Sequence, residues 1–465
     1  MKKLKLVWLL ALSALFLFSA CKKKQEAVIQ TDTGADENYI ATRSTNHVDW
    51  AKDAVIYEVN VRQYTKEGTF KAFEEHLPRL KELGVDILWL MPISPISEKN
   101  RKGEMGSYYS VQDYKKVNPE FGTEEDFKAI IEKAHELGMH VILDWVANHT
   151  GWDNPWITEN PEWYTKDENG KIIPPNPDWT DVADLNYYNV EMRAAMIDAL
   201  EYWVKEFNVD GYRCDVAGEV PVDFWNDARK ALDEIKPVFM LAEAWEPQLS
   251  EDAFDMVYGW ESHHIMNEVA KGNKTAVALH DIIVKDANRY HEDTYIMQFI
   301  TNHDENSWNG TEFERMGDAV KTFATLTFTM PGMPLIYSGQ EAGLDKRLAF
   351  FKKDEISWED MKLTDFYKKL TALKHDNEAL WNGNSGGKYM AISDSPKDVL
   401  AFSREKNNNK VVCLFNFSDE EQTYNGNDFK LNGIYTEYFS DEKLNFKENS
   451  SILLKPWEYK VFIKK

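Results

Sequence analysis

The sequence predicts an α/β fold: a (β/α)8 TIM barrel with a short insertion after its third strand, followed by a C-terminal antiparallel β domain. Two observations predict the barrel. From Asp53 onward, apolar runs of strand length alternate with helical patterns, which is typical of a parallel sheet covered by helices. Four of these runs lead into an Asp or Glu, which marks the place where a buried strand leaves the core. The extent of the alternation favours a closed barrel over an open sheet.

The first expected strand is Ala54–Val59. Apolar residues then recur at helical spacing from Phe70 to Leu83, where Gly84 ends the pattern. Thr123 begins a second helix with a capping-box-like start, because Asp126 follows three residues later. The other expected barrel elements are strands at Val85–Met91, Met139–Leu143, Val209–Tyr212, Val238–Ala242, Tyr295–Ile300 and Pro331–Tyr337, and a closing helix near Leu363–His375.

A long segment, residues 150–187, separates the third strand from the next helix. It is rich in Trp, Pro, Asn and Asp and lacks helical periodicity, and a loop of this length is usually functional. After Gly383 the pattern changes to short alternating strands and Asn-rich turns. These strands are expected at Val399–Ser403, Val411–Phe417, Ile452–Leu454 and Tyr459–Phe462, with turns at Asn407–Asn409 and Asn425–Asn427. We therefore expect the barrel over residues 48–384 and a β-sandwich over residues 385–465.

The N-terminus predicts export. Three lysines precede the apolar stretch Leu6–Phe18, which is too short for a comfortable membrane span and suits a signal peptide over residues 1–20. Phe18–Cys21 resembles the bacterial lipoprotein signal, in which the cysteine is lipidated; the alternative is an ordinary signal peptide with a nearby cysteine. The polar residues 21–47 are expected to form a flexible tether. We expect a lipid anchor at Cys21 that holds the protein to a membrane of the cell envelope, on the periplasmic side or the outer-membrane surface.

Composition narrows the possible partners. The net charge of −24 argues against a nucleic-acid partner, because phosphate binding needs a basic surface. The 16 Trp, 21 Tyr and 24 Phe supply either core volume or flat faces for sugar rings. Besides Cys21, the chain has only Cys214 and Cys413, which lie in different segments, so no structural disulfide is expected.

Four acidic segments carry the chemistry, namely Asp144–His149, Gly211–Val216, Met240–Glu243 and Phe299–Asp304. The carboxyl ends of barrel strands meet on one face, so these groups are expected to converge there. Retaining glycosidases need a nucleophilic carboxylate and a carboxylic acid roughly 5 Å apart. Three converging carboxylates with Arg, Asn and His beside them fit this cleavage of a glycosidic bond.

Asp215 suits the nucleophile, because Arg213 lies on the same side of the strand and is expected to keep it ionised. Glu243 suits the acid/base, because its apolar neighbours favour the protonated form. Asp304 is expected to stabilise a positively charged ring. His149 and His303 are expected to bind sugar hydroxyls, and Tyr109 to stack on the ring. Each residue alone has a structural alternative, such as a cap, an ion pair or loop packing, and the ordered set favours a site.

These segments resemble the motifs of the α-amylase family, glycoside hydrolase family 13, across roughly residues 48–465. The four motifs are matched by Asp144–His149, Gly211–Asp215, Glu243 and Asn302–Asp304, and Tyr109–Tyr114, Asp184–Asn186 and Pro331–Glu341 also agree. The resemblance implies Asp215 as nucleophile, Glu243 as acid/base and Asp304 as transition-state stabiliser. It also implies a glucose pocket with Arg213, His149, His303 and Tyr109, and makes the insertion a B domain.

Two departures from the pattern of the α-amylase family concern substrate specificity and metal binding. Gly218 and Glu219 stand where many α-amylases have Lys-His, and Val216–Val220 is more similar to the neopullulanase and cyclomaltodextrinase branch. We expect Glu219 to line an acceptor subsite. The family's calcium site uses the Asn of the first motif, here Asn148. Its amide with Asp184 or Asp181 offers hard oxygen ligands for Ca²⁺, and a metal-free B domain is the equal alternative.

The expected function is a retaining hydrolase of α-1,4-glucosidic bonds in starch or malto-oligosaccharides. A transglycosylase and a cyclomaltodextrinase or neopullulanase-type enzyme of the same family are the alternatives. A non-catalytic glucan-binding protein is the alternative of a different class. The presence of all three carboxylates together with Arg213 argues against it.

Overall fold

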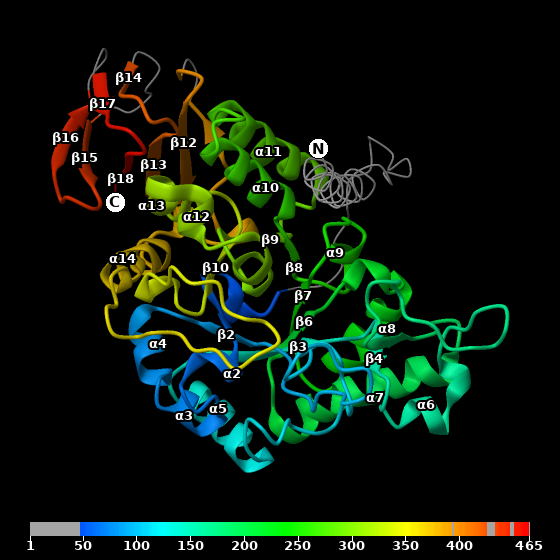
Figure 1. Cartoon of the computed structure of the whole chain (residues 1–465). Coiled ribbons are helices and arrows are strands. Elements are labelled where there is room, and N and C mark those ends of the chain that lie inside the picture. Colours follow the sequence, from blue (N-terminus) through cyan, green and yellow to red (C-terminus); the bar gives the residue numbers. More distant parts are fainter. Residues whose placement is uncertain (1–46, 393–394, 426–432, 447–450, 465) are drawn as a thin grey trace, which may run out of the picture. The chain divides into compact units, whose positions relative to one another are not determined.

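A computed structural model of the chain describes residues 47–392, 395–425, 433–446 and 451–464. Eight parallel strands close into a barrel in the order β1-β10-β9-β8-β7-β6-β3-β2 (Figure 1). The predicted (β/α)8 barrel is therefore confirmed. The barrel strands are β1 (Ile56–Val59), β2 (Ile87–Leu90), β3 (His140–Trp145), β6 (Gly211–Cys214), β7 (Phe239–Ala242), β8 (Met256–Tyr258), β9 (Tyr295–Gln298) and β10 (Met333–Tyr337).

Helices surround the strands, and each turns an apolar face towards them. The capping box predicted at Thr123 is present at the start of α5, where Thr123 and Asp126 satisfy each other's backbone N–H groups. The main helices are α3 (Phe70–Glu74), α4 (Leu77–Leu83), α5 (Glu124–Glu136), α7 (Val190–Phe207), α8 (Val222–Asp233), α10 (Trp260–Ala270), α11 (Ala276–Arg289), α12 (Glu312–Met316), α13 (Val320–Thr329) and α14 (Thr364–His375), with short α2 (Val61–Tyr64) and α9 (Leu249–Asp252).

Two expectations for the barrel were wrong. The single helical pattern from Phe70 to Leu83 forms two helices, because Pro78 lacks the N–H that a continuous helix needs and instead lies in the first turn of α4. The sixth barrel strand, β8, was missed. It contains only three residues, all buried, and so short an apolar run carries no periodic signal.

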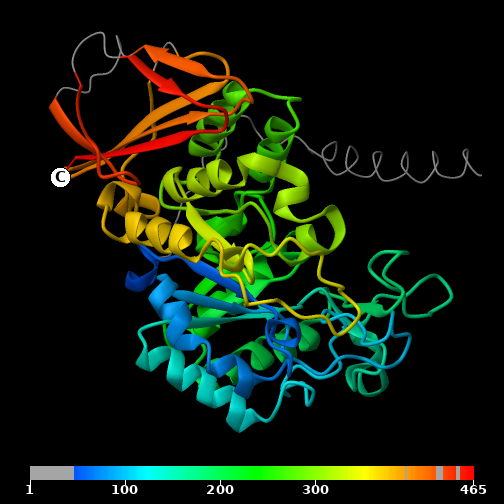
Figure 2. The same cartoon turned by 60° about the vertical axis from the view of Figure 1, so that its left-hand side comes forward.

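The insertion after β3 forms a small two-stranded unit. Strand β4 (His149–Gly151) pairs antiparallel with β5 (Val182–Asp184), so that His149 lies opposite Asp184. Between them lie the short helix α6 (Trp156–Glu159) and a long loop that projects from the barrel (blue-green in Figure 2). This pairing returns the loop to the carboxyl ends of the barrel strands.

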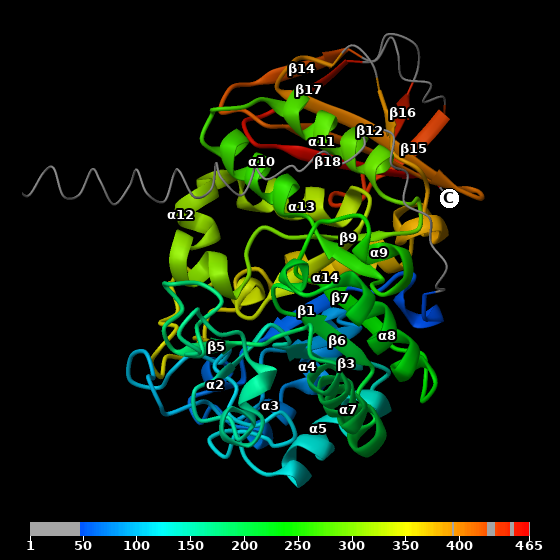
Figure 3. The ribbon, with the colours of Figure 1, turned by 90° about the vertical axis from the view of Figure 1, so that its right-hand side faces the viewer.

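The C-terminal segment is all-β, as predicted. One sheet has the order β11-β12-β13-β18-β15-β16, and β14 pairs with β17 in a second, two-stranded sheet. Helix α11 lies against β12 of the larger sheet (Figure 3). Its strands are β11 (Met390–Ala391), β12 (Val399–Lys406), β13 (Asn409–Asn416), β14 (Gln422–Asn425), β15 (Gly433–Glu437), β16 (Lys443–Phe446), β17 (Ser451–Leu454) and β18 (Tyr459–Lys464). The sequence missed β11, β14, β15 and β16, and part of the turn expected at Asn425–Asn427 lies outside the described residues.

The residues of the expected signal peptide, and nearly all of those of the expected tether, lie outside the described residues, so the signal peptide, the tether and the lipidation of Cys21 stay predictions. Of the helices in the described ranges, none has the length and apolar character required to cross a bilayer. Cys214 and Cys413 are both buried free thiols.

Candidate active site

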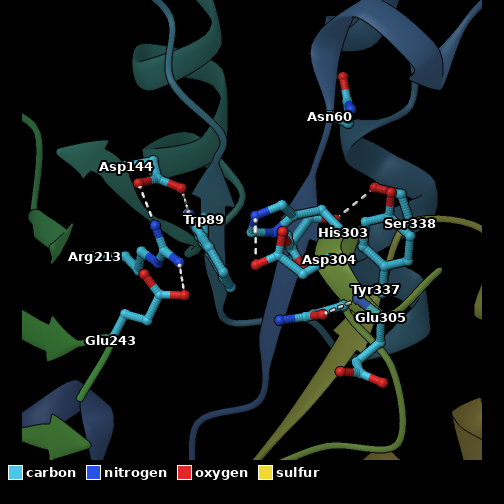
Figure 4. A network of polar contacts seen from close by, with 12 residues as sticks. Asn60, Trp89, Asp144, Arg213, Glu243, His303, Asp304, Glu305, Tyr337 and Ser338 are labelled. Atoms are coloured by element: carbon cyan, nitrogen blue, oxygen red, sulfur yellow. Dashed lines mark hydrogen bonds and ion pairs between the residues drawn. The ribbon is translucent and has the colours of Figure 1, made fainter. Parts of the chain in front are cut away.

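One buried arginine organises the acidic groups at the carboxyl ends of the strands. Arg213 on β6 donates from Nη1 to Asp144 Oδ1 at 2.8 Å and to Asp215 Oδ1 at 3.0 Å. Its Nη2 lies 2.9 Å from Glu243 Oε1, an ion pair without hydrogen-bond geometry. Figure 4 shows Asp144 and Glu243 on two sides of this guanidinium. A single cation therefore holds three carboxylates from three different strand ends.

Aromatic side chains enclose the guanidinium. The Trp89 ring lies 5.0 Å from its central carbon, and the Tyr258 hydroxyl accepts from Nε at 3.2 Å. Burial alone would lower the pKa of Arg213, but the carboxylates of Asp144 and Glu243 raise it well above its usual value. Arg213 is therefore a permanent positive charge.

Asp215 and Glu243 share this arginine, and the sharing changes their protonation. Burial raises the pKa of Asp215 well above its usual value, and the Glu243 carboxylate raises it further, which outweighs Arg213. Arg213 lowers this pKa, as expected, but burial and the carboxylates of Glu243 and Asp144 raise it by more, so the expectation that Arg213 keeps Asp215 ionised was wrong in its net result. Burial likewise raises the pKa of Glu243, although the Val216 N–H donates to its Oε2 at 2.8 Å. The pair is thus disposed to hold a proton between them.

Val216, directly after Asp215, has left-handed backbone angles of φ 37° and ψ 47°. A β-branched residue rarely adopts this conformation, and strain of this kind is found where a site needs a particular geometry. Here the turn aims the Val216 N–H at Glu243 and links the second and third acidic segments.

His303 organises the opposite side of the site. Its Nδ1 contacts Glu58 Oε1 on β1, its Nε2 lies 2.7 Å from the Tyr109 hydroxyl, and Asp304 Oδ2 is 3.4 Å from Nε2. The Tyr109 hydroxyl in turn donates to Asp144 Oδ2 at 3.1 Å, so His303 donates from both nitrogens. Although burial lowers the pKa of His303, Asp304 and Glu58 raise it to about 9.

The charges of the cluster do not balance. Five carboxylates (Glu58, Asp144, Asp215, Glu243 and Asp304) face two cationic groups (Arg213 and His303). Such a site takes up protons and favours a positively charged ring in its centre. This is the electrostatic requirement of a glycosidase whose transition state resembles an oxocarbenium ion.

Two predicted substrate residues lie outside this network. His149 is buried and bonds to the backbone of Tyr109, and burial lowers its pKa to about 4, so it is neutral. Glu219 is exposed on the short turn Ala217–Glu219 and acts electrostatically on Asp184 of the insertion.

Sequence reasoning missed three residues of the network. Glu58 could have been found, because it is a lone acid inside the apolar run Ile56–Val59. Trp89 carries no signal in a run that is apolar throughout. Tyr258 was missed together with its strand β8. Asp144 appeared in the first motif but was not assigned a role, and here it accepts from Trp89 Nε1 at 3.1 Å as well as from Arg213.

The predicted calcium ligands fit a cation in part. Asp181 is already paired with Lys102 Nζ at 3.0 Å, which removes it from the set. Burial raises the pKa of the half-buried Asp184, and the nearby Glu219 carboxylate raises it further. A cation beside Asp184 would offset both the burial of its carboxylate and the repulsion from Glu219. Asn148 lies close by, since its carbonyl accepts from Leu185 N at 3.2 Å, so Asn148 and Asp184 remain the candidate oxygen ligands for Ca²⁺.

Comparison with known proteins identifies the family. A family model described as "Alpha amylase, catalytic domain" matches residues 39–179 and 176–417, and one described as "Alpha amylase, C-terminal all-beta domain" matches residues 389–455. The chain belongs to the α-amylase family. It is therefore a glycoside hydrolase, in agreement with the acidic site at the strand ends.

Relatives of this α-amylase-family enzyme differ in specificity. The α-amylase MalA of Haloarcula japonica is 30% identical over 394 residues, 80% of this chain, and this chain spans 57% of that relative. The cyclomaltodextrinase of Thermoanaerobacter pseudethanolicus is 26% identical over 80% of this chain and 72% of its own length. The solved noncanonic maltogenic α-amylase AmyB of Thermotoga neapolitana has a TM-score of 0.82 and 31% identity, over 89% of this chain and 99% of its own.

Proposed function

We propose that this α-amylase-family enzyme is a retaining hydrolase of α-1,4-glucosidic bonds in starch or malto-oligosaccharides. The observation that carries the proposal is the contact of Asp215 and Glu243 with adjacent nitrogens of one guanidinium. This holds the two carboxylates close together, as a retaining mechanism needs, whereas an inverting mechanism needs room for a water between them.

In this mechanism Glu243 donates its proton to the glycosidic oxygen while Asp215 attacks the anomeric carbon and forms a glycosyl ester. Water then enters, Glu243 takes its proton, and the ester bond breaks, which frees Asp215 and releases a product of retained configuration. Asp304 supports the positive charge that develops on the ring in both steps. Arg213 holds Asp215 and Glu243 in place, and Tyr109 offers a flat face beside them.

A timed product profile on maltoheptaose, cyclodextrin, pullulan and soluble starch tests the proposal, with anomeric configuration followed by NMR. We expect α-configured maltose or glucose first. Initial β-configured product would overturn retention, and failure to cleave any of the four substrates would overturn the substrate class. Asp215→Asn should abolish hydrolysis, and Glu243→Gln should reduce it by several orders of magnitude while substrate binding persists; wild-type rates in Asp215→Asn would refute the mechanism.

Cyclomaltodextrinase or neopullulanase action is the second candidate. It is supported by Val216–Val220 and by relatives named cyclomaltodextrinase and maltogenic α-amylase. A transglycosylase would use a sugar hydroxyl in place of water, and Glu219 is the residue we propose on the acceptor side. Faster cleavage of cyclodextrin than of starch would indicate a cyclomaltodextrinase or neopullulanase-type enzyme. Products longer than the substrate would indicate a transglycosylase.

We further propose Ca²⁺ bound by Asn148 and Asp184, which would tie the insertion to the barrel. This Ca²⁺ takes no part in the catalytic steps above.

We also propose that Cys21 is lipidated and anchors the enzyme in the cell envelope. Detergent-phase partitioning of the full chain tests the anchor, and Cys21→Ser should move the enzyme to the aqueous phase; partitioning that is equal in both would refute it.

A further inference from the structure

A strip of aromatic rings leads away from the site. Tyr109 lies beside Phe350, with centroids 6.4 Å apart and planes within 11°. Phe350 in turn contacts Phe351 at 5.0 Å and Trp308 at 5.3 Å. Trp308 is at the outer end, and 52% of its surface is exposed. We name Tyr109, Phe350, Phe351 and Trp308 the aromatic strip.

Hydrogen bonds hold the strip in place. Trp308 lies on the π-helical turn η4 (Glu305–Asn309), and Phe350 and Phe351 lie on the loop after β10. Asn306 Oδ1 accepts from Leu348 N at 2.8 Å, and Ser307 Oγ donates to Leu348 O at 3.0 Å. Met105 N donates to Phe351 O at 2.9 Å from the loop after β2. Three separate loops therefore meet around these rings before any ligand arrives.

The position of the strip assigns it to one side of the scissile bond. The acid/base Glu243 marks the side of the leaving group, since it protonates the leaving oxygen. In Figure 4, Asp304 and Glu305 lie across the site from Glu243. Trp308 belongs to the same turn as Glu305 and contacts Phe350, which lies beside Tyr109. The strip thus continues on the non-reducing side, away from the leaving group.

We infer that the aromatic strip binds the glucosyl rings on the non-reducing side of the bond to be cleaved, with Trp308 stacking on a ring beyond the one held at Tyr109. The inference rests on the proposed glucan hydrolysis. An indole that is half exposed beside a catalytic site has no packing role for its outer face, and aromatic faces bind the apolar faces of pyranose rings. The strip would make the enzyme prefer substrates with two or more rings on this side.

Paired substrates that differ only on that side test the inference: p-nitrophenyl α-glucoside fills one position, and p-nitrophenyl α-maltotrioside fills three. We expect Trp308→Ala to lower kcat/KM on the maltotrioside about twofold to tenfold, the range for one aromatic stack. The glucoside should be hydrolysed at the wild-type rate. Trp308→Phe keeps a flat ring and should recover most of the loss. Leu453→Ala is the matched control, because Leu453 has a similar exposure of 54% and lies on the C-terminal β17.

A second readout gives the direction. In maltoheptaose labelled at its reducing end, loss of Trp308 should move cleavage towards the non-reducing end, so that longer labelled products appear. Equal losses on both aryl substrates, no loss on either, or a shift towards the reducing end would overturn the inference. A wild-type enzyme that cleaves no α-glucan would instead overturn the proposed function.

Discussion

Replacement of Glu58 by Gln tests whether strand β1 sets the charge of the site. The carboxylate is fully buried, and His303 Nδ1 is its hydrogen-bonding partner. A pKa raised from 6.5 to about 9 corresponds to about 3 kcal/mol in favour of the charged imidazole, to which Asp304 and Glu58 both contribute. If Glu58 supplies about half of this, Glu58→Gln should lower the pKa of His303 by about one pH unit.

The raised pKa of His303 determines how the stability of the fold changes with pH. Because folding raises this pKa, the charged His303 stabilises the fold fully below pH 6.5, and this stabilisation is lost as pH rises through about 9. Glu58→Gln should move this loss to lower pH. The alkaline limb of the activity profile should move with it if the charged imidazole is required.

NMR titration of the His303 ring measures the effect directly. The chain has 11 histidines, so His303→Asn is needed to assign the resonance. Asp86→Asn is the matched control, because Asp86 pairs with His375 at 2.7 Å and lies outside the acidic network. It should leave the titration of His303 unchanged. A wild-type His303 that titrates near 6.5, or an equal titration in Glu58→Gln, would refute the reasoning.

Three further predictions concern stability. Arg213→Met leaves three carboxylates without their shared cation and should lower the free energy of unfolding by about 3 kcal/mol; urea denaturation with an unchanged midpoint would contradict this. Arg404 on β12 is buried and donates to the backbone carbonyls of Gly387, Met330 and Trp381, so it links the C-terminal domain to the barrel. Arg404→Met should lower the free energy of unfolding by about 3 kcal/mol, measured by urea denaturation. A decrease below about 1 kcal/mol would show that water replaces these hydrogen bonds. Chelation of calcium should lower the Tm by about 5 °C in the wild type and not in Asp184→Asn, and identical Tm values with and without chelator would remove the calcium proposal.

The sequence by itself determined the fold class and the acidic residues of the site. A buried parallel strand is apolar throughout, so Asp215, Glu243 and Asp304 stood out where their strands ended. Local chemistry also determined the start of α5, because the capping box of Thr123 and Asp126 involves only neighbours in the chain.

Only the tertiary structure decided how these groups affect one another. Strand β8 contains three residues, so its place in the barrel and the contact of Tyr258 with Arg213 depend on neighbouring strands. Glu58 meets His303 across 245 residues of chain, and the aromatic strip joins three loops that are distant in sequence. The sequence predicted that Arg213 acts on Asp215 alone. In the fold, the same guanidinium also contacts Asp144 and Glu243. Protonation depends on burial and on every charge nearby, and both are properties of the closed barrel that no local pattern contains.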